Sequence, residues 1–194
     1  GSFTNILGID VADGRYNATS VLTSYTSVVY VSRSDIYLTY VEWSSAETWV
    51  VDGAGDGTTI STAASPMPQT TIYRLELQDI SAIPVSRGEV DGYLLNQFSL
   101  DAKEGVLRLA TTSGWQGQEN MVYTLDRDMQ VMGRLDGRGM NESIQSARFL
   151  DDVLYLVTFE RVDPLFVIDL SDPYHPTVLG ELVLPGFSSY LHPI

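Results

Sequence analysis

The sequence feature that most constrains the fold is a unit of four short β-type runs that recurs along the chain. Its clearest copy occupies residues 143–184 and reads SIQSARFL, DVLYLVTF, DPLFVIDLSDPYHP and TVLGELVL. Runs rich in Val, Ile, Leu, Tyr and Phe are typical of strands, and the Asp, Pro, Ser and Gly residues between them are typical of turns. The chain is therefore predicted to be a β repeat protein.

Matching residues keep a nearly constant spacing from one unit to the next. Gly88, Gly133 and Gly180 each precede a charged and an aliphatic residue, and they are 45 and 47 residues apart. Leu107 and Leu154, in the predicted second strands, are also 47 residues apart. A third marker, an aromatic residue in the third run, occurs at Tyr73, Tyr123 and Phe166. Units of this length with four strands are typical of the blades of a β-propeller.

The predicted strands fill about three blades of a partial ring. They are expected at residues 28–31, 36–41, 71–77 and 83–90, then at 93–100, 106–112, 121–125 and 131–135, and then within 143–184. The run NILGIDV, with Gly8 matching the other glycines, is expected to be a lone last strand of a preceding blade, and residues 187–194 match the first strand of another.

The predicted organisation is a single all-β domain over residues 1–194, a partial β-propeller with a long loop excursion at residues 44–69. Its open blade edges are expected to favour self-association. A β-sandwich or open meander is the alternative, and a sandwich would alternate polar and apolar residues more cleanly. The runs LYLV at 154–157 and FVI at 166–168 are apolar throughout, which favours strands covered on both faces.

Composition excludes several classes of partner and site. The chain has 25 acidic and 11 basic residues and a net charge of −14, so it repels phosphate backbones and is not expected to bind nucleic acid. The absence of cysteine excludes disulfides, thiolate metal sites and a cysteine nucleophile. No apolar run approaches the roughly 20 residues that span a bilayer, so no membrane span is expected.

Several segments resemble a known family. They are YLVTF at 155–159, DPLFVIDLSDP at 163–173, VLGEL at 178–182, PGFSSYLHP at 185–193 and YLLNQF at 93–98. This pattern is similar to the β-propeller domain of secreted prokaryotic proteins, a family distantly related to WD-40 repeats. The resemblance implies an extracellular or cell-surface protein. It implies no established reaction, so no catalytic residue carries over from it.

Few residues have the chemistry of a functional site. Asp52 and Asp56, in the segment DGAGDG, are the candidate metal ligands, for calcium. Glycine and alanine fill the positions between them, which favours a plain acidic loop. Trp115, in a glycine-bearing loop, and His175, in the turn at 172–176, are the candidate binding residues. No catalytic or cofactor-binding residue is identified, and calcium is the one cofactor considered.

These observations predict a non-enzymatic extracellular scaffold that binds protein or glycan partners through loops at one face of the propeller. The alternative is a catalytic propeller module, a polysaccharide hydrolase or lyase. That alternative follows from fold analogy and requires acidic side chains that converge on the central channel.

Overall fold

The computed structural model describes residues 2–23, 25–43, 49–52, 59–62, 67–114, 119–138, 142–159 and 163–184. The elements in these ranges are strands, apart from one short 3₁₀ helix, η1 (Gln97–Ser99). Among the described residues, none form a helix long and apolar enough to cross a membrane.

Most strands belong to three four-stranded antiparallel sheets, here called blades 1, 2 and 3. Blade 1 contains β3 (Val28–Val31), β4 (Asp35–Trp43), β7 (Pro68–Gln78) and β8 (Ser81–Asp91). Blade 2 contains β9 (Leu100–Lys103), β10 (Val106–Ser113), β11 (Glu119–Leu125) and β12 (Val131–Arg138). Blade 3 contains β13 (Ser143–Leu150), β14 (Val153–Phe159), β15 (Asp163–Asp169) and β16 (Thr177–Leu184). In each blade the strands lie side by side in chain order, from first to fourth.

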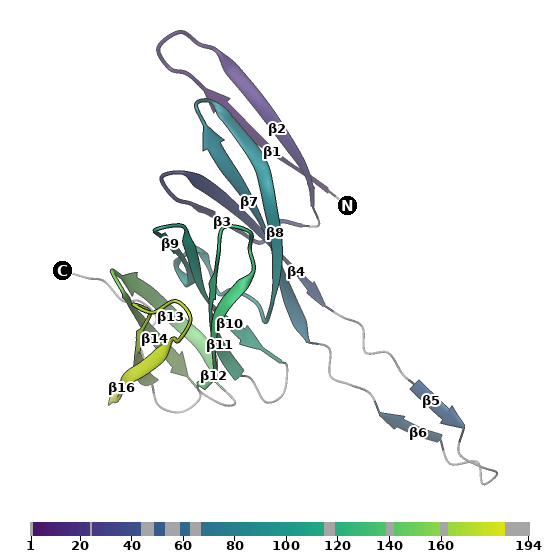
Figure 1. Ribbon diagram of the computed structural model, residues 1–194. Coiled ribbons are helices and arrows are strands. Elements are labelled where there is room, and N and C mark those ends of the chain that lie inside the picture. Colours follow the sequence, from purple (N-terminus) through teal and green to yellow (C-terminus); the bar gives the residue numbers. More distant parts are fainter. Residues whose placement is uncertain are drawn as a thin grey trace.

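The sheets follow one another in chain order as an open arc (Figure 1), and each neighbouring pair encloses its own core. Between blades 1 and 2 the core contains Tyr37, Ile72, Val90, Leu107, Leu109, Met121, Tyr123 and Leu125. Between blades 2 and 3 it contains Ala110, Val122, Ile144, Ala147, Leu154, Leu156, Phe166 and Ile168. A sandwich would have one interior shared by two sheets, so that alternative is wrong and the partial propeller is confirmed.

Strand β10 shows why the middle strands carry apolar residues on both faces, even though β10 also contains the buried Arg108. Leu107 and Leu109 point into the core shared with blade 1, and Ala110 points into the core shared with blade 3. Successive side chains of a strand point to opposite faces. A sheet that is covered on both sides therefore needs apolar residues at odd and even positions alike.

The chain differs from expectation at the start of blade 2. A strand is predicted at residues 93–100, but β9 begins at Leu100, after η1. The side chain of Asn96 accepts a hydrogen bond from the backbone N–H of Phe98 at 2.9 Å, which caps η1. An asparagine that binds the backbone in this way competes locally with strand formation. The preceding residues contribute one isolated bridge, between Tyr93 and Thr112.

The N-terminal region also differs, because it forms a hairpin rather than a lone last strand. Strand β1 (Ser2–Ile9) pairs along its length with β2 (Tyr16–Thr23), for which no strand is predicted. The turn after β1 resembles the turn between the third and fourth strands of blade 2. Asp10 Oδ1 accepts from the N–H of Ala12 at 2.8 Å, as Asp126 Oδ1 does from Asp128 at 2.9 Å.

This turn places β1 in the third-strand position of its sheet and β2 in the fourth. The short connection from β2 to β3 supports this assignment of β2 as a fourth strand, because the fourth strand of each sheet leads to the first strand of the next blade. Gly8 therefore lies one strand away from the position predicted for it. Strand β2 carries the polar sequence YNATSVLT and is largely exposed, so it lacks the apolar pattern by which the other strands are found.

The stretch at residues 44–69, expected as a loop excursion, contains two short strands. Strands β5 (Trp49–Asp52) and β6 (Thr59–Thr62) pair antiparallel as a hairpin between β4 and β7. Strand β7 already begins at Pro68.

The spaced glycines allow the blades to approach closely. A Cβ on Gly88 would overlap the carbonyl oxygen of Met129, in the turn between the third and fourth strands of blade 2. A Cβ on Gly133 would overlap the carbonyl oxygen of Pro173, in the same turn of blade 3. Gly8 makes the equivalent contact with the carbonyl of Ile80 in blade 1. We call this arrangement the glycine–turn contact.

We expect Gly133→Ala to destabilise the chain, because the added methyl group has no room beneath Pro173. Overpacking of this kind typically costs about 1–3 kcal/mol, or roughly 2–10 °C in thermal midpoint for a chain of this size. Gly180→Ala is the matched control, because a Cβ on Gly180 meets no atom within 4 Å. Thermal unfolding followed by circular dichroism tests this, and equal midpoints for the two variants would contradict it.

Candidate binding site on the first strands

The first strands of the three blades together line a pocket. Among the described strands, β3, β9 and β13 each pair with one neighbour, so no described strand covers their other edges. A pocket of about 420 Å³ lies along them. Its lining comes from all three blades and consists of Val29, Tyr30, Val31, Gln97, Phe98, Leu100, Asp101, Arg148 and Phe149. The site is therefore assembled only when the three sheets stack.

The lining has only slightly more apolar than polar surface, and part of it is open to solvent. Val29, Val31 and Phe98 are large apolar side chains that are exposed. The guanidinium carbon of Arg148 lies 3.5 Å from the centre of the Phe98 ring. A cation over an aromatic face is attracted by the electron-rich ring. The pocket thus combines apolar surface with one cationic side chain whose position is fixed by the ring.

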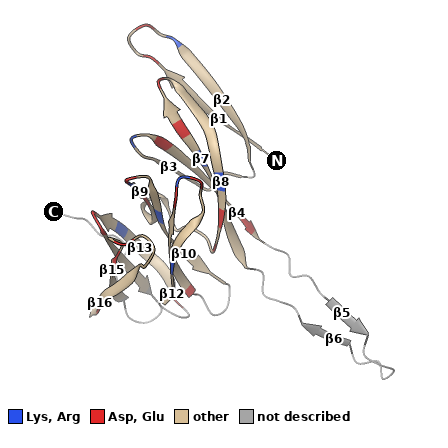
Figure 2. Cartoon of the chain, viewed as in Figure 1, with Lys and Arg blue, Asp and Glu red and all other residues tan. Residues whose placement is uncertain are grey.

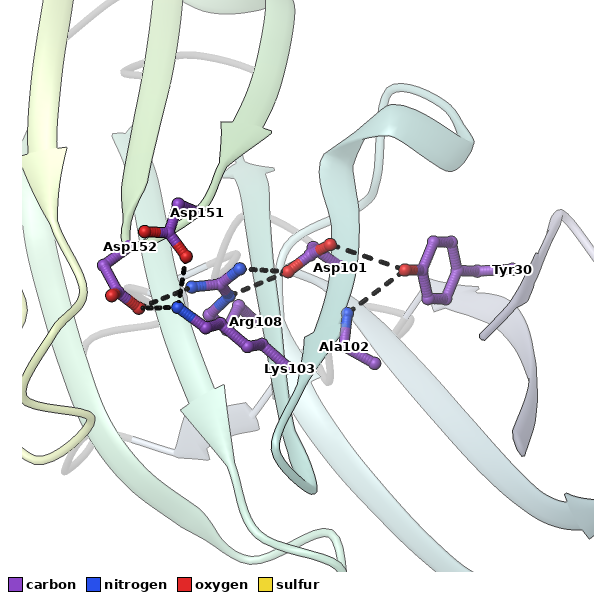
Figure 3. A network of polar contacts seen from close by, with 7 residues as sticks. All are labelled: Tyr30, Asp101, Ala102, Lys103, Arg108, Asp151 and Asp152. Atoms are coloured by element: carbon purple, nitrogen blue, oxygen red, sulfur yellow. Dashed lines mark hydrogen bonds and ion pairs between the residues drawn. The ribbon is translucent and has the colours of Figure 1, made fainter. Parts of the chain in front are cut away.

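A polar network behind the pocket joins blade 1 to blade 2 (Figure 3). One oxygen of Asp101 accepts from the Nε of Arg108 at 2.9 Å, and the other accepts from the Tyr30 hydroxyl at 3.5 Å. The hydroxyl oxygen of Tyr30 accepts from the N–H of Ala102 at 3.2 Å. Burial raises the pKa of Tyr30, so its hydroxyl keeps the proton that it donates to Asp101.

The same network continues to the turn between β13 and β14, in blade 3. Lys103 Nζ donates to Asp152 Oδ1 at 2.7 Å and also to Asp151. Arg108 Nη1 lies 3.7 Å from Asp152 Oδ1. Hydrogen bonds to the two aspartates raise the pKa of Lys103, and the hydrogen bond from Lys103 lowers the pKa of Asp151. Asp101, Arg108 and Lys103 therefore link Tyr30 of β3, through blade 2, to the turn that follows β13.

A second hollow, of about 720 Å³, shares Tyr30 and Val31 with the pocket. Its lining includes the exposed residues Arg33 and Arg127. Within the described ranges, no carboxylate forms an ion pair with either guanidinium. Basic residues are sparse along the strands (Figure 2), as expected for a chain with 11 of them. Two of these few therefore lie together beside the pocket.

The arrangement is suited to binding. Asp101 is the one acidic residue in the lining of the pocket, and both of its oxygens already accept hydrogen bonds. A pair of carboxylates that acts as acid and base needs two such groups across a cleft. Over the residues that the structure describes, no group of three or more His, Cys, Asp or Glu is placed to hold a metal ion.

The residues proposed from sequence lie elsewhere or outside the described ranges. Asp52 ends β5, whereas Asp56 and Trp115 lie outside the described residues, so the calcium site stays a prediction. His175 is exposed in the turn between β15 and β16, where its Nδ1 lies 2.9 Å from Asp172 Oδ2. The structure does not bring His175 to the pocket.

Sequence reasoning missed the residues that line the pocket. Phe98 and Arg148 lie in different blades and are 50 residues apart in the chain, and no motif links them. The alternation of Val29 and Val31 on one face of a short run was the one available signal. It becomes informative only when that run is known to be the open edge of a sheet.

We expect Arg108→Met to destabilise the chain by about 2–4 kcal/mol, because it leaves Asp101 without its buried charge partner. The side chain of Arg108 is 5% exposed. Arg15→Met is the control, since the Arg15 side chain is 57% exposed and its ion pairs are worth at most about 1 kcal/mol. Urea unfolding at neutral pH measures both variants, and a smaller loss for Arg108→Met than for Arg15→Met would be inconsistent with the network.

Two archaeal relatives share much of the sequence. An uncharacterized protein of Methanocaldococcus jannaschii is 47% identical over 120 residues, which are 60% of this chain and 19% of the relative. An uncharacterized protein of Archaeoglobus fulgidus is 47% identical over 121 residues, which are 62% of this chain and 18% of the relative. The aligned part therefore spans about a fifth of the length of these relatives. No solved structure matches the chain.

The family comparison agrees with the stacked four-stranded sheets. The family model described as "Beta propeller domain" matches residues 1–194, the whole chain. Together with the three blades and their separate cores, this match shows that the chain belongs to the β-propeller domain family.

Proposed function

We propose that the protein is a binding scaffold that takes a protein segment into the pocket on its first strands. The observation that carries the proposal is the lining of that pocket, in which exposed apolar side chains surround a single, already paired acid. A volume of about 420 Å³ is in the usual range for sites that accept a few side chains. The bound segment inserts apolar side chains between β3 and β13.

The charges beside the pocket select the chemistry of the partner. Arg148 lies at the pocket, and the adjoining hollow is lined by Arg33 and Arg127. Glu104 and Asp35 line it as well, and Asp35 is paired with Arg74. Acidic residues next to the apolar side chains of the partner complement the guanidinium groups of Arg148, Arg33 and Arg127. The partner segment is therefore apolar at its centre and acidic at its ends.

A protein segment fits this site better than a glycan does. Sugar rings bind to aromatic side chains by stacking on an open ring face, and Arg148 occupies one face of Phe98. The catalytic alternative, a polysaccharide hydrolase or lyase, has the support of fold analogy alone. An extracellular location is part of the proposal and follows from the resemblance to secreted proteins. Fractionation of cells that express the full-length protein tests that part.

The binding proposal is tested with short peptides selected by phage display on the purified chain. We expect the selected peptides to combine aromatic or aliphatic residues with Asp or Glu. Val29→Ser should weaken their binding about ten-fold, because it removes apolar surface from the pocket. Val131→Ser is the matched control, since Val29 and Val131 are each 47% exposed and Val131 lies on β12, away from the pocket. Fluorescence anisotropy gives the dissociation constants.

Two outcomes count against the proposal. Equal loss of peptide binding in the two variants would mean that the contact is not made in the pocket. Binding of oligosaccharides from a glycan array that Val29→Ser abolishes, with no peptide selected, would identify a glycan site instead.

A further inference from the structure

One glycine of the repeat, Gly180, has no turn packed against it among the described residues. Gly88 and Gly133 lie against turn carbonyls of the following blade, and Gly8 does so from the neighbouring strand position. A Cβ on Gly180 meets no atom within 4 Å, although Gly180 matches Gly88 and Gly133 in spacing and in strand. Gly180 therefore keeps the glycine of the repeat but lacks the glycine–turn contact that explains Gly88 and Gly133.

The face around Gly180 matches the covered face of blade 2, row by row. In blade 2, the two cross-strand rows that face blade 3 are Arg108–Thr124–Gly133 and Ala110–Val122–Leu135. In blade 3, the equivalent rows are Tyr155–Val167–Gly180 and Val157–Leu165–Leu182. The second set is the more apolar one, so this face is built to be covered at least as well as its counterpart.

Exposure shows that the described residues leave the β16 side of this face uncovered, although Val157, in the second row, is 0% exposed. Leu135 packs against the core between blades 2 and 3, whereas Leu182, in the equivalent row, is 54% exposed. Leu179, next to Gly180, is exposed as well. No described strand pairs with the outer edge of β16, so its backbone groups lie along this surface as well.

We propose that the face of blade 3 around Gly180 docks a further four-stranded sheet of the same repeat, supplied by the polypeptide that follows blade 3. The turn between the third and fourth strands of that sheet lies with a backbone carbonyl oxygen against Gly180. Thr124 donates a hydrogen bond to the carbonyl of Pro173 at the contact beside Gly133. Val167 replaces that threonine beside Gly180, so the new contact is made by packing alone.

Three observations favour the same polypeptide as the source of this sheet. Residues 187–194 match, in sequence, the region that begins blades 2 and 3. Each blade begins only a few residues after the previous one ends. The aligned relatives are about five times as long as the part that they share with this chain, so they have room for further sheets.

A second copy of the chain is the rival occupant, because the described residues include a similar turn, at 10–15, whose tip packs against no glycine; Arg15, at its end, pairs with Asp79 of blade 1. Gly14 (φ 77°) donates its N–H to the carbonyl of Asp10 at 2.9 Å, as Met129 (φ 61°) does to Asp126 at 3.1 Å. Val11, in the same turn, is 97% exposed. The turn at residues 10–15 is one residue longer than the turn at 126–130, so it resembles the docked turn without matching it. The experiment distinguishes the two sources.

The test compares the chain of residues 1–194 with a longer polypeptide that continues through the next sheet of the natural protein. Amide hydrogen exchange in β16 is the readout, because it reports local cover directly. We expect β16 amides to exchange about ten-fold more slowly in the longer polypeptide. In the longer polypeptide, Gly180→Ala should remove most of the protection of the β16 amides from exchange. In the shorter chain, the same substitution should leave β16 exchange unchanged. Gly133→Ala is the positive control and should accelerate exchange at β12 in both proteins.

The other outcomes would overturn the proposal. Equal protection of β16 in the two polypeptides would mean that no sheet docks there. Loss of protection on Gly180→Ala in the shorter chain as well would assign the glycine a local backbone role. Concentration-dependent association of the shorter chain that Gly180→Ala abolishes would assign the surface to a second copy. The proposal is independent of peptide binding, so Val29→Ser should leave β16 exchange unchanged.

Discussion

The burial of sheet faces between consecutive blades is the interaction on which the rest of the structure depends. A four-stranded sheet cannot bury either face by itself, and stacking in chain order gives each face a partner. The core between blades 1 and 2 and the core between blades 2 and 3 share the strands of blade 2, both faces of which carry buried apolar side chains. Close approach then requires glycine where a turn of one blade meets the fourth strand of another, as at Gly88 and Gly133.

The same stacking creates the candidate site. Because every blade begins with its first strand at one edge, stacking brings β3, β9 and β13 together along the pocket. The network through Asp101, Arg108 and Lys103 then holds these edges in place across three blades. A binding surface made in this way is as rigid as the sheets behind it, so little conformational entropy is lost when a ligand binds.

The fold was predictable to the extent that it depends on patterns within one strand or one repeat. The glycine spacing gave the fourth strands, and apolar runs such as 154–157 gave the buried ones. Strand β2 was not predicted because it is exposed and polar. The 3₁₀ helix η1 was not predicted because a single cap at Asn96 overrides the strand preference of the neighbouring residues. The pocket could not be predicted, because Phe98 meets Arg148 only through the stacking of separate sheets.

Nuclear Overhauser effects across the blade boundaries of the isotope-labelled protein test the stacking of the blades most directly. Consecutive stacking predicts contacts from the Hα protons of Gly88 to the side chain of Met129 and from those of Gly133 to the Hδ protons of Pro176. Both contacts join residues that are more than 40 positions apart in the sequence. Assigned spectra that lack both contacts, and instead connect the faces of blades 1 and 3, would contradict the stacked arrangement.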